Sequence, residues 1–315
     1  MSNSQWASDP VGQFHHRHFA PLADRIEDLF CAHGEKIHRG SELSELMESA
    51  RYLAALADVP ETIQMNALHY YNGFSFSRIA KSAIYLDYRP GYRQIFRDLS
   101  TGTVNFWNSA QSKAKDIEWE LLLWSHLNRV FPGCARLAEP DIVLNLAHRE
   151  IGIACKRVYN FKRVVDQIRE GANQLRRHNL SGIVALSFDP YEGRKDGYCL
   201  LKAPDYRKVS TGTFAYFGDI WKRIASETIR KYLEPNRVIG LIIAVQGFIQ
   251  VGEAPENIAE YNAVRLQTYP NSPKQNQELM DILHRAGTED AKPIESDILK
   301  RLEHLKELAI AVGRQ

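Results

Sequence analysis

An acidic and a basic residue stand at the outer ends of two apolar segments joined by a short polar turn. Asp141 begins the first segment, directly after Pro140, and Lys156 lies near the end of the second. If the turn centres on His148 and Arg149, antiparallel pairing places Asp141 opposite Lys156, and directly opposed residues share one face of the sheet. A carboxylate beside an ammonium group can bind a cation and position a water molecule, so this hairpin is a candidate catalytic site.

A second carboxylate is expected to approach the hairpin from the preceding helix, which is predicted at residues 113–131. At helical spacing, Glu120 falls within the apolar arc of this helix, whereas Glu118 falls on the polar side. Burying a carboxylate is unfavourable unless it meets a cation or hydrogen-bond donors. Either a metal ion or a salt bridge to an arginine at the edge of the core would explain Glu120.

Basic residues gather after the hairpin, within and before a helix predicted at residues 163–178. Clustered positive side chains suit contacts with nucleic-acid phosphates, and a solvated helix face is the alternative of equal weight. Gln167 and Gln174 share one margin of this helix, where they could contact a phosphate or a water. The alternative, an amide that faces solvent, is favoured somewhat more for Gln174 than for Gln167. The residues expected to contact phosphates are Arg157, Lys162, Arg163, Arg169 and Arg176.

The predicted elements divide the chain into three parts. Residues 1–105 form a helical region, with helices at 41–58 and from Pro90 to Leu99. Residues 106–275 form an α/β domain with a helix, two or three strands, the basic helix, a parallel strand at 183–188, a helix at 219–233 and a long strand at 238–251. Residues 276–315 form a helical tail whose apolar spacing suits either a homodimer seam or packing on the parent domain.

Composition limits the classes of protein to which the chain can belong. Of its 315 residues 44% are hydrophobic, which is ample for a core, and the net charge of +2 confines any nucleic-acid binding to local clusters. The 4 cysteines are scattered, which argues against a disulfide framework and a zinc cluster. No apolar run approaches the roughly 20 residues of a membrane helix, and the start lacks a secretion signal, so a cytoplasmic protein is expected.

The helix glutamate, the Pro-Asp pair before a strand, the strand ending in x-x-Lys and the basic helix together resemble the PD-(D/E)xK nuclease superfamily over residues 116–190. The resemblance implies a restriction-endonuclease-like α/β fold with a mixed sheet flanked by helices. It implies that Glu120 and Asp141 bind Mg²⁺ or Mn²⁺ and that Lys156 orients or activates the attacking water. Gln167 matches a helix position that is glutamine in several branches of the family.

The sequence departs from the family pattern at Ala154, where the family has an aspartate or glutamate. Mg²⁺ usually binds one or two carboxylates together with waters and substrate phosphate, so Glu120 and Asp141 could suffice. Asp116 and Asp166 are the candidates for a migrated acid. The expected function is hydrolysis of DNA phosphodiester bonds, in the bacterial defence or mobile-element setting that the family suggests.

Two alternatives remain beside the nuclease. One is a catalytically inactive nuclease fold that binds nucleic acid or another protein. The other is an interaction protein built on the N-terminal helical region and the C-terminal helix. Common enzyme motifs, including the phosphate-binding loop of nucleotide hydrolases and the serine nucleophile elbow, are absent from the sequence.

Overall fold

The computed structural model of the chain describes its central elements and part of its second half. The described residues are 18–56, 67–83, 86, 90–105, 110–130, 133–146, 149–188, 199–204, 218, 222, 224, 238–251 and 258–268. The helical tail at 276–315 and most of the helix expected at 219–233 lie outside them. None of the described helices is both long enough and apolar enough to cross a membrane.

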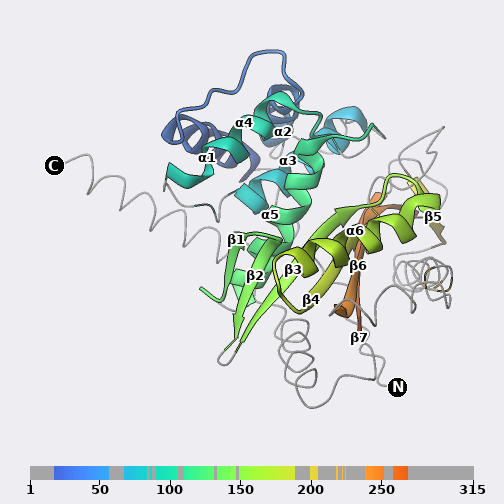
Figure 1. Cartoon of the computed structure of the whole chain (residues 1–315). Coiled ribbons are helices and arrows are strands. Elements are labelled where there is room, and N and C mark those ends of the chain that lie inside the picture. The colour runs from blue at the N-terminus through green and yellow to red at the C-terminus, as the bar shows by residue number, and fades with distance from the viewer. Residues whose placement is uncertain are drawn as a thin grey trace.

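The described residues between 18 and 105 form helices and short connections. The helices are α1 (Phe19–Ala32), α2 (Glu42–Leu56), α3 (Ala67–Ala83), the short η2 (Pro90–Tyr92) and α4 (Arg93–Thr101). The hydroxyl of Ser41 accepts a hydrogen bond from the backbone N–H of Ser44 at 3.2 Å, which caps α2. Figure 1 shows these helices grouped on one side of the molecule, with α5 (Lys113–Val130) between them and the strands.

The strands form one mixed sheet, which confirms the α/β class. They are β1 (Ala135–Ala138), β2 (Asp141–Leu146), β3 (Arg149–Arg157), β4 (Gly182–Ser187), β5 (Cys199–Ala203), β6 (Val238–Val251) and β7 (Ile258–Thr268). The first three strands form an antiparallel meander, and β4 and β6 continue the sheet in parallel to β3. Near its end β6 also pairs with β5, and β7 runs antiparallel along its other edge. The sequence did not predict β7.

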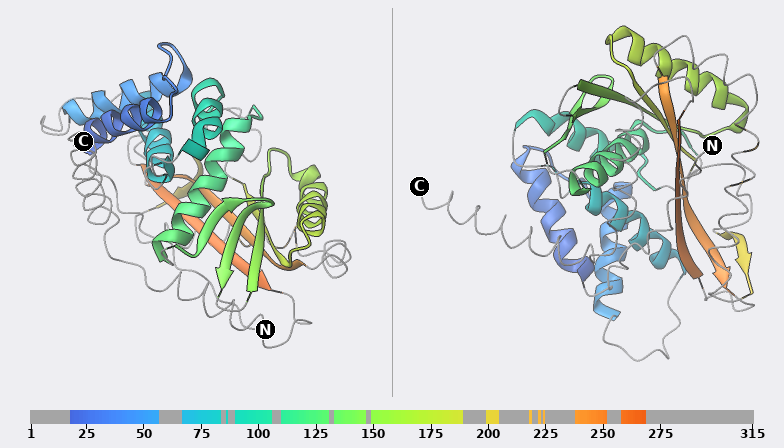
Figure 2. Two further views of the ribbon diagram at one scale, coloured as in Figure 1. Left: turned by 60° about the vertical axis from the view of Figure 1, so that its left-hand side comes forward. Right: turned by 90° about the horizontal axis from the view of Figure 1, so that it is seen from below.

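Helices cover the sheet on both faces. Residues on α5 belong to the same core cluster as Ile153, whereas the next residue of β3, Ala154, packs beneath α6 (Val164–Arg177). Neighbouring residues of a strand face opposite ways, so α5 and α6 lie on opposite faces. Figure 2 shows both helices against the strands. The same core cluster extends from α5 into α1, α2, α3 and α4, so the helical region and the sheet share a hydrophobic core.

The hairpin of β2 and β3 forms as predicted, but with a different register. Ile142 pairs with Ile153 and Leu146 pairs with Arg149, so continuing the ladder places Asp141 opposite Ala154 and not opposite Lys156. The predicted pairing was wrong by two residues. Because a shift of two preserves the face on which each side chain lies, the apolar alternation is satisfied by both registers and could not distinguish them.

Candidate active site

Asp141 is held between a neighbouring strand and a helix. One carboxylate oxygen accepts the backbone N–H of Cys155 at 2.6 Å, and the other accepts the side-chain amide of Gln174 at 2.8 Å. The same amide nitrogen of Gln174 also donates to the carbonyl of Pro140. The alternative that Gln174 faces solvent, which the sequence favoured more for Gln174 than for Gln167, was therefore wrong, because this part of α6 lies over the beginning of β2.

Glu120 and Lys156 lie close enough to Asp141 to interact with it electrostatically. Burial and the negative charge of Asp141 raise the pKa of Glu120 to about 8, and the positive charge of Lys156 opposes this shift. Burial raises the pKa of Asp141 to about 6, against the effects of Lys156 and of the two hydrogen bonds to its carboxylate. Two carboxylates and one lysine, from α5, β2 and β3, thus influence one another electrostatically in a partly buried environment, and they form the candidate site.

Ala154 precedes Lys156 by two residues on β3, where the PD-(D/E)xK pattern that the sequence resembles has a further acid. Its side chain is completely buried. A methyl group at Gly171 of α6 would meet the side chain of Ala154 at 3.4 Å and that of Val184 at 2.9 Å. The absence of a side chain at Gly171 lets α6 approach β3 closely, and this packing fills the space beside Ala154.

Glu120 and Asp141 are the two carboxylates of this site that could hold a divalent cation. No group of three histidine, cysteine, aspartate or glutamate residues within the described part of the chain could hold a metal ion. Each oxygen of Asp141 already accepts one hydrogen bond, and a carboxylate offers about four lone-pair sites in all, so acceptor capacity remains on both oxygens. Mg²⁺ is compatible with this set because it commonly keeps several waters.

Asp116 is the better placed of the two candidates for a migrated acid. It lies one turn before Glu120 on α5, and its negative charge contributes to raising the pKa of Glu120. Its carboxylate accepts a hydrogen bond from the hydroxyl of Tyr159 at 3.0 Å. Asp166 is instead exposed and pairs with Arg169 at 2.8 Å. Gln167 lies half-buried in the first turn of α6, seven residues before the glutamine that binds Asp141.

The basic residues after β3 divide into an exposed set and a buried arginine. Exposed side chains occur along α6 and in the short turn before it, η3 (Phe161–Arg163); they belong to Lys162, Arg163, Arg169, Arg176 and Arg177. Arg157 is buried, with a nitrogen 2.5 Å from a carboxylate oxygen of Glu118. Its expected role as a phosphate contact does not agree with this position.

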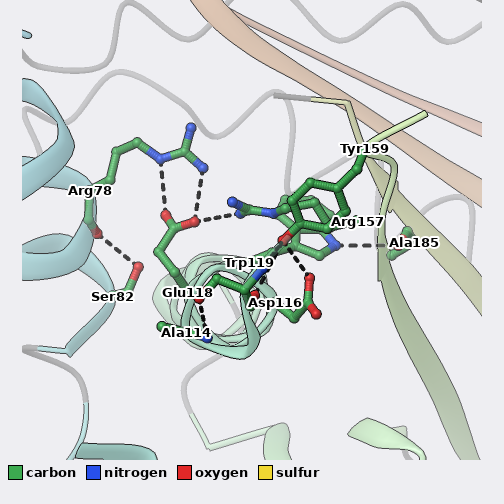
Figure 3. A network of polar contacts seen from close by, with 10 residues as sticks. Arg78, Ser82, Ala114, Asp116, Glu118, Trp119, Arg157, Tyr159 and Ala185 are labelled. Carbon is green, nitrogen blue, oxygen red and sulfur yellow. Dashed lines mark hydrogen bonds and ion pairs between the residues drawn. The ribbon is translucent and has the colours of Figure 1, made fainter. Parts of the chain in front are cut away.

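Glu118 is buried as well, so the prediction that it lies on the polar side of its helix was wrong. Its carboxylate receives a two-pronged contact from Arg78 of α3, at 2.9 and 3.2 Å, in addition to the contact from Arg157 (Figure 3). The physical reason is that α5 is covered on two sides, by the sheet and by the helical region. A single apolar arc does not describe such a helix.

Comparison with known proteins adds no assignment to this geometry. No protein-family model, no curated protein and no solved structure matches the chain.

The pKa of Glu120 predicts how the stability of the metal-free protein depends on pH. Because the pKa is raised from 4.5 to about 8 on folding, the folded state binds this proton more tightly than the unfolded state. The stabilisation that this proton provides is fully present below pH 4.5. It is lost as the pH rises from there through the folded-state pKa of about 8. We expect urea unfolding to show stability falling across this window. Glu120→Gln, which cannot titrate, should show a flatter profile, and parallel profiles would contradict the shift.

Proposed function

We propose that the chain is a divalent-metal-dependent nuclease that hydrolyses phosphodiester bonds, with DNA as the first substrate to test. The observation that carries the proposal is the convergence of Glu120, Asp141 and Lys156 from three different elements. The order of elements supports it, because a helix, three strands, a helix and a parallel strand follow one another from α5 to β4. This order agrees with a restriction-endonuclease-like domain.

Each residue has a distinct part in this proposal. Glu120 and Asp141 would hold Mg²⁺ or Mn²⁺, which supplies charge neutralisation at the phosphate and a more acidic water. Lys156 orients the attacking water or the phosphate oxygen through its positive charge. Gln174 and the backbone of Cys155 keep the carboxylate of Asp141 in one orientation. The exposed basic side chains of α6 bind the nucleic-acid backbone, which positions the scissile bond.

Metal binding provides the first test of this proposal. We expect Asp141→Asn to weaken binding of Mg²⁺ or Mn²⁺ by about 100-fold or more, because it removes one of two charged ligands while keeping the side-chain shape. Isothermal titration calorimetry, with and without a short DNA duplex, would measure the loss. Glu150→Gln is a matched control, since Glu150 is an acid of β3 that is exposed and paired with Arg136 at 3.0 Å.

The comparison between these variants decides the outcome. Weakened binding in Asp141→Asn with unchanged binding in Glu150→Gln would locate the metal at the candidate site. Equal binding in the natural chain and in both variants would mean that any metal lies elsewhere, and the proposal would then be wrong.

A binding protein without catalytic activity is the second candidate, and the packing around Ala154 favours it. A nuclease fold that has lost one acid could keep the exposed basic face of α6 for nucleic acid. This reading predicts DNA binding that weakens steeply with salt concentration, together with no cleavage in Mg²⁺ or Mn²⁺. Fluorescence anisotropy at several salt concentrations, run beside a cleavage assay, separates the two functions.

A further inference from the structure

Three charged side chains meet in the interior between α3, α5 and β3. Arg78, Glu118 and Arg157 are exposed by 1%, 3% and 3%, respectively. The nitrogens of Arg78 lie 2.9 and 3.2 Å from the two oxygens of Glu118, and a nitrogen of Arg157 lies 2.5 Å from the second oxygen. Figure 3 shows the carboxylate between the two guanidinium groups. One glutamate therefore joins three elements.

The geometry of this network suits orientation better than it suits stability. Removing charges from water is costly, and apolar residues of similar volume often stabilise a fold as well as a buried ion pair does. The two-pronged contact of an arginine, however, fixes both the distance and the angle of the carboxylate. The network is thus best explained by a requirement for one particular arrangement of the elements that it joins.

Two of those elements, α5 and β3, carry residues of the candidate site, namely Glu120 and Lys156. Glu118 precedes Glu120 by two residues on α5, which turns the two side chains about 200° apart around the helix. Arg157 directly follows Lys156 on β3, and neighbouring strand residues face opposite ways. The contact between Glu118 and Arg157 therefore joins α5 to β3 through side chains that are neighbours in the chain of Glu120 and Lys156 but point away from them. It sets the separation between the backbone that carries Glu120 and the backbone that carries Lys156.

A second contact fixes the same helix against the sheet. The indole N–H of Trp119 donates to the carbonyl of Ala185 in β4 at 3.3 Å. Arg78 adds a contact from α3, a helix that contributes no residue to the site itself. The position of α5 is thus determined from the sheet and from the helical region together.

We propose that the network of Arg78, Glu118 and Arg157 is a positioning device that holds Glu120 and Lys156 in their working arrangement. The inference rests on the proposed function. It makes the helical region a part of the active-site architecture, with Arg78 as a positioning residue more than 30 positions before the first site residue.

Arg78→Met in the full-length chain tests this proposal without requiring any activity. It removes the contact from α3 and keeps the length and much of the apolar character of the side chain. We expect faster amide hydrogen exchange in α5 and at the end of β3, around Lys156, because both lose a common anchor. Arg51→Met is the matched control: Arg51 also joins two helices of this region, through contacts of 2.9 and 2.6 Å with Asp24 and Glu27, but at the surface.

Kinetics provides the second arm of the experiment. In folded Arg78→Met we expect kcat for DNA cleavage to fall by about 10- to 100-fold with KM nearly unchanged, because misplaced groups affect the chemical step more than substrate binding. Arg78→Lys keeps the charge but not the two-pronged geometry, and it replaces Arg78→Met if that variant does not fold. Arg51→Met should keep both constants.

The outcomes distinguish this inference from the proposed function. Faster exchange confined to α3, together with an unchanged kcat, would overturn the positioning role and leave a structural ion pair. If the natural chain neither binds metal nor cleaves DNA, the proposed function fails in the natural chain itself. In that case the exchange arm still decides whether the network holds α5 against β3.

Discussion

Replacing Lys156 by methionine is expected to slow DNA cleavage by about 100- to 1,000-fold while leaving the fold intact. Methionine has a similar length but carries no charge. Lys156 is half-buried, and its positive charge opposes the rise that burial causes in the pKa of both Glu120 and Asp141. Loss of one preorganised group that stabilises developing charge typically lowers kcat by about this factor. Single-turnover cleavage at saturating metal and DNA would isolate the chemical step.

Lys162→Met is the matched control for this experiment. Lys162 lies a few residues further along the chain, and its side chain is exposed. Its backbone N–H donates a hydrogen bond to the side chain of Asn160, and the substitution keeps this contact. We expect weaker DNA binding and a nearly unchanged rate at saturating DNA. If both variants lost activity to the same extent in kcat, the special role of Lys156 would be contradicted. If neither did, the proposed active site would be wrong.

The sequence was most informative where a residue pattern depends on local geometry alone. Apolar alternation predicted β2 and β3, and three- and four-residue spacing predicted α5 and α6, because each pattern follows from the period of a strand or a helix. The sequence placed Asp141 and Lys156 on one face of this hairpin by the same alternation, although in the wrong register. These features require no knowledge of distant partners.

The sequence was least informative where partners far apart in the chain decide the outcome. Glu118 is buried because Arg78, 40 residues away, reaches it from α3, and a helical wheel shows only one helix. Gln174 reaches Asp141 across 33 residues because of how far α6 extends over the start of β2. The departure from the PD-(D/E)xK pattern at Ala154 was visible in the sequence, but the closeness of Gly171 to Ala154 depends on the docking of α6 on the sheet.

Ala154→Glu introduces the acid of the PD-(D/E)xK pattern that the sequence resembles, and we expect it to destabilise the protein by about 3–5 kcal/mol. Ala154 is completely buried, and the backbone of α6 at Gly171 lies close above it. Overpacking a well-packed core costs about 1–3 kcal/mol. A buried carboxylate without a cation adds further cost, and here it would stand beside Asp141. Urea unfolding of the metal-free protein would measure the loss.

Ala154→Gln separates the two contributions, because glutamine has the shape of glutamate without its charge. If packing dominates, both variants should lose similar stability. If charge dominates, Ala154→Gln should lie much closer to the natural chain. Ala154→Gly, which removes volume, is the control for the loss of a methyl group and should change stability by less than either larger side chain.

Added Mg²⁺ then tests whether position 154 is closed by packing or is open to a further ligand. A cation that bound only the folded protein would recover stability in proportion to its affinity. An open position would therefore give Ala154→Glu tighter Mg²⁺ binding, recovered stability and faster cleavage than the natural chain. We expect none of these, because α6 occupies the space that the longer side chain needs. If Mg²⁺ instead restored the stability of Ala154→Glu, α6 would be able to move away from position 154. The natural site would then have room for a further metal ligand at this position.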